Sequence, residues 1–182
     1  MLQQIAYRGP DGQASAVGTQ HALAMARLAI SAPNSPTTLY TDCHARWVTA
    51  FNGEIYNYQE LTEELRQRGH RFDTTCDAEL LPHLFEEYGI SGIAKLTGMF
   101  SIAAWNEHSR ELFLVRDRFG IKPLFYTFRS GILYFASEAK AFLPAVGALA
   151  IDPFSLHDVF SFSFPLRQRT FFRDVNEVLP SH

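Results

Sequence analysis

Four short apolar runs in the second half of the chain constrain its fold most strongly. Each has the length and the aromatic or aliphatic content of a short strand. The runs are Met99–Trp105, Glu111–Arg116, Pro123–Phe128 and Ile132–Ala136. Because polar or glycine-containing turns separate most of them, the sequence predicts antiparallel strands joined as hairpins. The charged turn Asp117–Pro123 is interpreted either as a solvated connection or as an active-site loop.

Two segments with helical periodicity precede these strands. The first is predicted to run from Tyr58 to about Arg68, with Asn57 as its N-cap. The second is predicted to end at Tyr88, and Asp77 stands at its entrance. Asp77 is interpreted either as the N-cap of this helix or as a functional carboxylate that the helix N-terminus positions.

The stretch Phe51–Asn57 lies between the apolar run Trp47–Phe51 and the first helix. It is predicted to be a strand-to-helix turn that carries an amide, a glycine and a carboxylate. Asn52 and the Gly53 N–H could together donate hydrogen bonds to a developing oxyanion, and Glu54 could bind a substrate ammonium. The alternative interpretation is an ordinary Asn-Gly turn that leads into a capped helix.

Arg27 is embedded among apolar residues, downstream of the dense turn Arg8–Gly12. An arginine in such a place needs a partner. It is interpreted either as a surface or internally paired side chain, or as the ligand of a substrate carboxylate, which the planar guanidinium group can bind through two hydrogen bonds.

The composition excludes several classes of protein. With 182 residues, 47% of them hydrophobic, the chain fits one domain with a sizeable core. Its formal net charge of −3 and its scattered basic residues indicate neither nucleic acid nor a membrane as a partner. The two cysteines, Cys43 and Cys76, are too few and too far apart to indicate a disulfide scaffold or a metal site, so no metal is expected. No apolar signal segment opens the chain, and a cytoplasmic location is expected.

Seven runs in register resemble one family. They are Arg8–Gly12, Arg27–Ile30, Phe51–Asn57, Asp77–Glu79, Leu96–Phe100, Arg116–Phe125 and Phe135–Ala141. Their order and spacing resemble the glutaminase domain of the asparagine synthetases, which are class II, N-terminal-nucleophile (Ntn) glutamine amidotransferases. The resemblance implies that residues 1–182 form one amidotransferase domain that ends before a synthetase domain. It also implies an α+β fold, a four-layer αββα sandwich of antiparallel sheets of the Ntn-hydrolase type.

The resemblance further implies a glutamine site. It places the α-carboxylate of L-glutamine on Arg27 and the α-ammonium on Glu54 and Asp77. Asn52 and Gly53 would form the oxyanion hole for the tetrahedral intermediate. The residues implied to bind glutamine are Arg27, Leu28, Ala29, Ile30, Ser31, Asn52, Gly53, Glu54 and Asp77.

The nucleophile of the family is a cysteine at the mature N-terminus, where its own α-amine acts as general base. This sequence starts with Met1 and Leu2, and Cys43 and Cys76 have amide nitrogens in place of a free amine. The first strand of the sandwich, which carries the nucleophile, is therefore expected to be missing, and the chain itself is predicted to be inactive. Three explanations stay open: a fragment of an intact enzyme, a protein that binds glutamine without hydrolysing it, and a scaffold without a ligand.

In the intact family members, the released ammonia serves the ATP-dependent amidation of aspartate. Because no phosphate-binding Ser-Gly-Gly loop occurs in this sequence, ATP and Mg²⁺ are expected only with the synthetase domain. The expected partners are L-glutamine and that domain, and a homodimer is an open quaternary arrangement. The alternative function is a non-catalytic glutamine-binding or scaffold domain of an amidotransferase-like synthetase.

Overall fold

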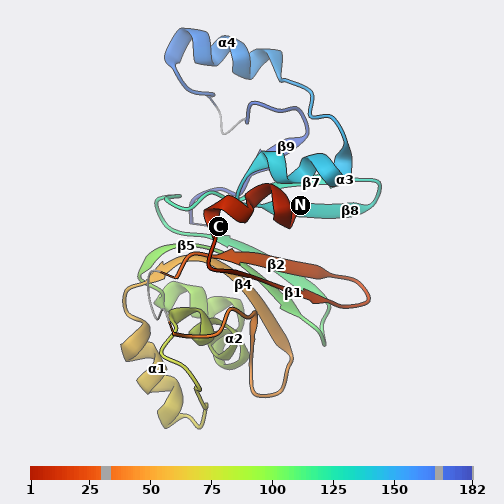
Figure 1. Ribbon diagram of the computed structural model, residues 1–182. Coiled ribbons are helices and arrows are strands. Elements are labelled where there is room, and N and C mark those ends of the chain that lie inside the picture. Colours follow the sequence, from red (N-terminus) through yellow and green to blue (C-terminus); the bar gives the residue numbers. More distant parts are fainter. Residues whose placement is uncertain (30–33, 167–169, 182) are drawn as a thin grey trace.

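The computed structural model describes residues 1–29, 34–166 and 170–181. In these residues, helices combine with three antiparallel sheets (Figure 1). The α+β class and the antiparallel pairing expected from the sequence are confirmed. Ile30 and Ser31, which are among the residues implied to bind glutamine, lie outside the described residues.

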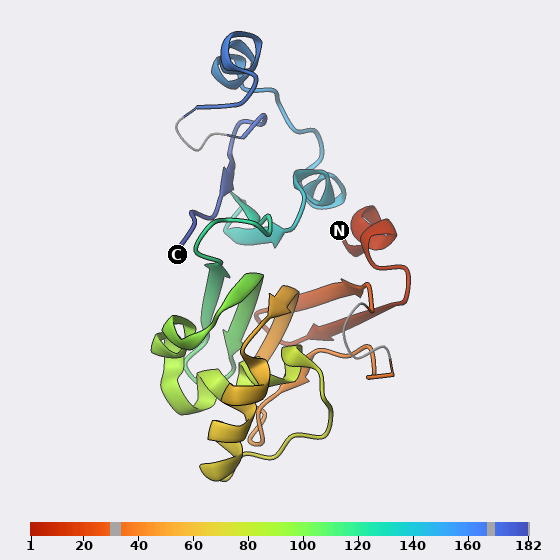
Figure 2. The same ribbon diagram turned by 90° about the vertical axis from the view of Figure 1, so that its left-hand side faces the viewer.

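A four-stranded sheet lies at the centre of the molecule. Its strands follow the order β3-β4-β5-β6. Their bounds are β3 (Tyr40–Thr41), β4 (Trp47–Ile55), β5 (Gly98–Asn106) and β6 (Glu111–Arg116). Helices α1 (Tyr58–Gln67) and α2 (Asp77–Tyr88) cover one face, and the 3₁₀ helix η2 (Gly89–Lys95) leads from α2 toward β5 (Figure 2).

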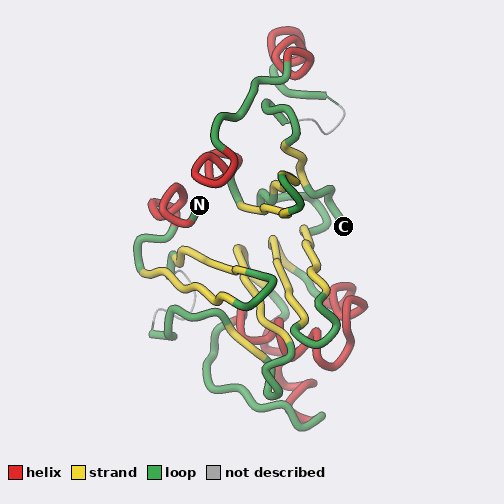
Figure 3. The backbone as a smooth tube through the Cα atoms, turned by 90° about the vertical axis from the view of Figure 1, so that its right-hand side faces the viewer, coloured by secondary structure: helices red, strands yellow, loops and turns green. Residues whose placement is uncertain are grey.

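The opposite face of this sheet is covered by a hairpin of β1 (Gly12–Val17) and β2 (Ala22–Arg27), which Figure 3 shows beside the sheet. A separate sheet with the order β8-β7-β9 contains β7 (Phe125–Arg129), β8 (Ile132–Ala136) and β9 (Val175–Glu177). The second sheet of the expected sandwich is thus divided, in the described residues, into a hairpin and a three-stranded sheet.

The remaining helices lie toward the two ends of the chain. They are η1 (Leu2–Arg8), η3 (Ala139–Phe142), α3 (Leu143–Val146) and α4 (Pro153–Phe162). Arg8 joins η1 to the start of η3, because its Nη1 lies 2.7 Å from Glu138 Oε1. Within the described ranges, no helix combines the length and the apolar character that crossing a membrane requires.

Strand alternation divides the core between the two faces of the central sheet. Trp47 and Ile55 of β4 belong to a buried cluster with the leucines of α1 and α2. Val48 and Ala50, one residue out of phase, pack with Leu23 of the hairpin in a second cluster. Because successive side chains point to opposite faces, the even-numbered positions of β4 face the hairpin.

Asn57 is the N-cap residue of α1, as predicted, whereas the interpretation of Asp77 as the N-cap of α2 is wrong. Asn57 occupies the N-cap position of α1 but makes no side-chain capping bond there. Its amide instead donates to the Lys95 carbonyl and accepts from the Thr97 N–H, because the loop before β5 comes within reach. Asp77 is the first residue of α2 and Cys76 holds the N-cap position, so Asp77 is not the N-cap.

Asp117 begins the turn between β6 and β7 and is only 1% exposed. The interpretation of this turn as a solvated connection is therefore wrong at Asp117. Its carboxylate accepts backbone N–H bonds of 3.0–3.2 Å, and the donors are Phe100, Phe119, Ile121 and Lys122. Burial alone would raise the pKa of Asp117, but these donors outweigh burial and hold the pKa below its ordinary value. The carboxylate therefore fixes the turn between β6 and β7 against β5.

Asp117→Asn tests this role. One amide oxygen cannot replace two carboxylate oxygens, so two of the N–H groups would face an NH₂ group. We expect a loss of about 2–4 kcal/mol of unfolding free energy at pH 7, measured by chemical denaturation. Because the folded-state pKa of Asp117 is lowered, its stabilising effect exists above the ordinary carboxyl pKa of about 4 and disappears as pH falls through the folded-state value.

The matched control is Glu111→Gln, at the exposed start of β6. It removes a carboxylate at the other end of β6 and should change stability by less than about 0.5 kcal/mol. Equal effects of the two substitutions at pH 7 would contradict the role assigned to Asp117.

Candidate functional site

Asn52, Gly53 and Glu54 lie inside strand β4, so the predicted strand-to-helix turn is wrong at these positions. The strand continues because β5 pairs with it along its whole length, up to Ile55 opposite Gly98. On the other side, β3 pairs only with Val48 and Thr49. In the described residues, the segment 52–54 therefore has a neighbouring strand on one side and an open edge on the other.

The open edge presents the Gly53 N–H. Ile55 N–H donates to Asp77 Oδ2 at 3.0 Å and thus points away from β5. Successive N–H groups of a strand alternate between its two edges, so the Gly53 N–H points the same way. Phe100, which stands opposite Gly53, uses its N–H and its carbonyl on Asp117. Gly53 is therefore left out of the hydrogen bonding between β4 and β5.

Glycine is required at position 53 by a close backbone approach. A Cβ there would lie 2.1 Å from the Met99 carbonyl oxygen, and φ is +152°. Gly98 has the reciprocal constraint, since its Cβ would lie 2.2 Å from the Glu54 carbonyl oxygen. Two glycines thus allow β4 and β5 to approach closely beside the open edge.

Arg27 is the last residue of β2 and has a buried side chain. It follows Leu23 at even spacing on the strand, so it lies on the face of the hairpin that packs against β4. Its backbone carbonyl accepts from the Asp11 N–H at 3.1 Å, and Asp11 Oδ2 accepts from the Ala29 N–H at 2.8 Å. The guanidinium Nη1 donates to the Ser35 carbonyl. The turn Arg8–Gly12 thus holds the end of β2 in place.

Asp77 is a buried carboxylate at the N-terminus of α2. Burial raises its pKa, and the nearby charge of Glu54 raises it further, against the lowering effect of the Ile55 and Ala78 N–H groups. The fold thus disfavours the charged form of Asp77. Two carboxylates that repel each other beside an open cavity are suited to bind a cation.

A cavity of about 1000 Å³ brings these groups together between the central sheet, the hairpin and β8. Among the residues implied by the sequence, those that line it are Arg27, Leu28, Asn52, Gly53, Glu54 and Asp77. Ala29 is not among the lining residues and is held by Asp11 instead. The described part of the chain holds two groups of potential metal ligands. One is Cys43, His70, His83 and Glu86, and the other is Asp42, His44 and Glu86; none of these residues lines the cavity.

Ser137 and Cys76 also line the cavity, and the sequence analysis gave neither of them a role there. Ser137 Oγ lies 3.5 Å from Asn52 Nδ2. Cys76 Sγ lies 3.8 Å from Asp77 Oδ1. Burial raises the pKa of the Cys76 thiol, and the adjacent Asp77 raises it further, so the thiolate is disfavoured. Adjacency to the motif at Asp77 was the signal that could have placed Cys76 in the cavity.

A family model of the glutamine amidotransferase domain matches residues 1–182. The chain therefore belongs to the glutamine amidotransferase domain family, and the resemblance drawn from the sequence motifs is confirmed. Its curated relatives include two asparagine synthetases (glutamine-hydrolyzing) of Bacillus subtilis strain 168. Asparagine synthetase 2 is 44% identical over 141 residues, which cover 78% of this chain and 19% of that protein. Asparagine synthetase 1 is 38% identical over 181 residues, which cover 99% of this chain and 28% of that protein.

The fold is likewise that of a known amidotransferase. Glutamine phosphoribosylpyrophosphate amidotransferase from B. subtilis, solved with ADP and GMP, superposes with a TM-score of 0.55 at 25% sequence identity, over 66% of this chain and 28% of that one. The chain thus spans less than a third of the length of the relatives that it matches.

Gly53→Ala tests the close approach of β4 and β5. We expect a loss of about 3 kcal/mol of unfolding free energy, because the new Cβ meets backbone atoms and the left-handed φ is strained. Gly131→Ala is the matched control: φ at Gly131 is +79°, but a Cβ there meets nothing within 4 Å. The control should cost about 1 kcal/mol, from strain alone. Equal losses in thermal or denaturant unfolding would show that the approach of the strands leaves room for a side chain.

Proposed function

We propose that the cavity beside the open edge of β4 binds L-glutamine. The observation that carries this proposal is the convergence of Arg27, Glu54 and Asp77, from three separate segments, on one cavity. A guanidinium group and two carboxylates match the two charged ends of a free α-amino acid. In this arrangement Arg27 pairs with the α-carboxylate, and Glu54 and Asp77 pair with the α-ammonium.

The cost of burying Asp77 supports this orientation. Its raised pKa means that ionisation in the empty cavity is opposed mainly by burial and then by Glu54. An ammonium ligand between the two carboxylates removes their repulsion and returns a counter-charge to each. Binding of glutamine and ionisation of Asp77 are then coupled, with each favouring the other.

In this proposal, Asn52 and Gly53 bind the side-chain amide of the ligand. We assign the Asn52 Nδ2 group and the Gly53 N–H, which lies outside the β4–β5 hydrogen bonding, to an oxyanion hole. The Ser137 hydroxyl, within 3.5 Å of Nδ2, orients the Asn52 amide. Each donor of such a pair contributes about 3–4 kcal/mol to stabilisation of the tetrahedral intermediate.

Hydrolysis needs a nucleophile with a neighbouring base. An N-terminal cysteine combines a thiol and a free amine in one residue. Cys43 and Cys76 lie inside the chain, and the Cys76 thiol has a raised pKa. We therefore assign to the polypeptide of residues 1–182 the binding of glutamine without its hydrolysis, and to an intact protein the release of ammonia.

In the longer protein, we propose that this domain supplies ammonia to a synthetase domain that uses ATP and Mg²⁺ to amidate aspartate. The names of the B. subtilis relatives and the small share of them that the chain spans support this partner. Exposed phenylalanines on α4, including Phe154 and Phe160, offer apolar surface for a contact with that domain. Both cysteines are free, which favours a reducing compartment such as the cytoplasm.

Calorimetry with L-glutamine tests the site. We expect binding by the 182-residue chain and an affinity at least tenfold lower in Arg27→Lys, because lysine cannot form the bidentate pair. Arg129→Lys, at the exposed end of β7, is the matched control and should bind like the unmodified chain. No heat of binding from a chain that melts cooperatively would contradict a glutamine site and favour a scaffold.

Asp77→Asn separates binding from folding. Because the folded-state pKa of Asp77 is raised, its contribution to stability is largest when it is protonated and falls as pH rises through the folded-state value. The asparagine keeps an acceptor for the Ile55 N–H. We expect unchanged or higher thermal stability at pH 7 together with glutamine binding at least tenfold weaker.

The assignment of hydrolysis is tested by an ammonia assay on the same 182-residue chain. No release above background is expected. Ammonia release that Asn52→Ala abolishes would overturn the view that this polypeptide binds glutamine without cleaving it.

A further inference from the structure

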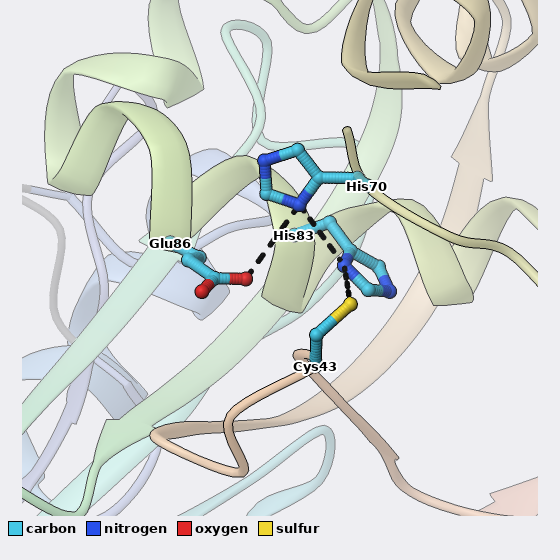
Figure 4. Close-up of side chains that lie close together, drawn as sticks. All are labelled: Cys43, His70, His83 and Glu86. Carbon is cyan, nitrogen blue, oxygen red and sulfur yellow. Dashed lines mark hydrogen bonds and ion pairs between the residues drawn. The ribbon is translucent and has the colours of Figure 1, made fainter. Parts of the chain in front are cut away.

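Four side chains from three segments converge on the helical side of the molecule (Figure 4). Cys43 lies in the turn between β3 and β4, and His70 lies in the loop between α1 and α2. His83 and Glu86 are three residues apart on α2, so they share one face of this helix. Their ligand atoms all lie within 4.8 Å of one another.

We propose that Cys43, His70, His83 and Glu86 form a structural zinc site. The sequence analysis expected no metal because it considered only the two cysteines, whereas the fold adds two histidines and a carboxylate to one of them. One thiolate, two imidazoles and one carboxylate are ligand types that Zn²⁺ binds, and four protein ligands complete its usual coordination.

Three of the six distances between the ligand atoms are close to those around a tetrahedral ion. A zinc ion with bonds of about 2.0–2.1 Å to nitrogen or oxygen and about 2.3 Å to sulfur separates its ligand atoms by roughly 3.3–3.6 Å. The two Nδ1 atoms of His70 and His83 are 3.3 Å apart. His70 Nδ1 lies 3.6 Å from Glu86 Oε2, and Cys43 Sγ lies 3.8 Å from His83 Nδ1.

The hydrogen bonds around this cluster satisfy only one of the two carboxylate oxygens of Glu86. In the described part of the chain, Glu86 Oε2 is buried and has no hydrogen-bond partner. The second oxygen, Oε1, is occupied by Arg46, whose Nη2 lies 2.6 Å away, and by His44. The Glu86 side chain is only 8% exposed, so water does not solvate it freely. A buried oxygen without a partner costs free energy unless a cation binds it.

The tautomer of His70 also favours a metal ligand. His70 Nε2 lies 3.2 Å from Glu87 Oε2, so the Nε2–H donates to this carboxylate. In the neutral imidazole the lone pair of Nδ1 then faces Glu86 Oε2, and these two acceptors need either a second ring proton or a metal cation between them. A carboxylate that orients a histidine through its outer nitrogen is a common feature of zinc sites. Glu87 is therefore a positioning residue.

A neighbouring group of Asp42, His44 and Glu86 could also be considered as a cation site. The Arg46 guanidinium lies against it, with Nη2 at 2.6 Å from Glu86 Oε1 and Nε at 3.8 Å from Asp42 Oδ2. The guanidinium thus already pairs with one oxygen of each carboxylate in this group, whereas Glu86 Oε2, near His70 Nδ1, has no hydrogen-bond partner in the described residues. The group with Cys43 is thus the better metal site.

A metal in this site would hold together elements that form the proposed glutamine cavity. A metal bound by these four residues joins the turn before β4 and the loop after α1 to α2. Helix α2 carries Asp77 at its first residue, so the metal would fix the helix without touching the ligand. Binding of zinc and binding of glutamine are separate measurements, and failure of one does not decide the other.

Cobalt substitution tests the proposal with the full 182-residue chain, freed of metal by a chelator. We expect one Co²⁺ per chain, with the intense visible bands of tetrahedral cobalt and a thiolate charge-transfer band in the near ultraviolet, and displacement by one equivalent of Zn²⁺. In Cys43→Ser the charge-transfer band should vanish and zinc affinity should fall at least tenfold, because the thiolate ligand is lost. Since Cys43 is exposed, this substitution should leave the fold intact.

Cys76→Ser is the matched control, because it removes the other free cysteine and should keep the charge-transfer band. Glu87→Gln should keep the band and weaken zinc binding by about tenfold, as expected for loss of a carboxylate that orients a ligand histidine. Retention of the band in Cys43→Ser, its loss in Cys76→Ser, or octahedral cobalt spectra in the unmodified chain would overturn the proposal.

Discussion

The carboxylate of Asp77 joins the open edge of β4 to the N-terminus of α2, and the geometry of the cavity depends on this connection. Its Oδ2 accepts from Ile55 N–H at 3.0 Å, at the end of β4 that, in the described residues, pairs with β5 alone. Because N–H groups alternate along a strand, this bond also sets the direction of the Gly53 N–H. One buried side chain thus aligns a helix, a strand edge and a backbone donor.

Two buried aspartates in this fold have opposite physical characters. Asp117 is surrounded by backbone donors, and its pKa is lowered despite burial. Asp77 has fewer donors and the charge of Glu54 nearby, and its pKa is raised. The first stabilises the connection between two sheets as an ionised group. Ionisation of Asp77 costs stability because its pKa is raised. This is the expected property of a residue that binds a ligand.

The cavity and the proposed zinc site lie on different sides of the same scaffold. Arg27 reaches the cavity from the hairpin, on the face of the central sheet that Val48 and Ala50 share. Cys43 and His83 lie with α2 on the helical side. Helix α2 contributes to both, with Asp77 at its start and His83 farther along. A metal on this helix would therefore affect the cavity only through the position of the helix.

Most strands could be predicted because their cause is local. The runs at Glu111–Arg116 and Ile132–Ala136 form strands with these bounds, since apolar content and flanking turns determine them. The segment 52–54 was predicted as a turn because Asn-Gly is a common turn dipeptide. It is a strand because β5 supplies a full row of partners, and Gly53 and Gly98 permit their close approach. Long-range pairing outweighed a local preference.

The sequence by itself determined the family, helices α1 and α2, several of the strands, and the residue types suited to a free amino acid, because these follow from local patterns and motif order. Only the tertiary structure decided which groups meet. It brought Arg27 and Asp77, fifty positions apart, to one cavity. It also placed Cys43, which looked isolated in the sequence, beside His70 and His83. Distances between such residues depend on the packing of separate elements, which no local pattern specifies.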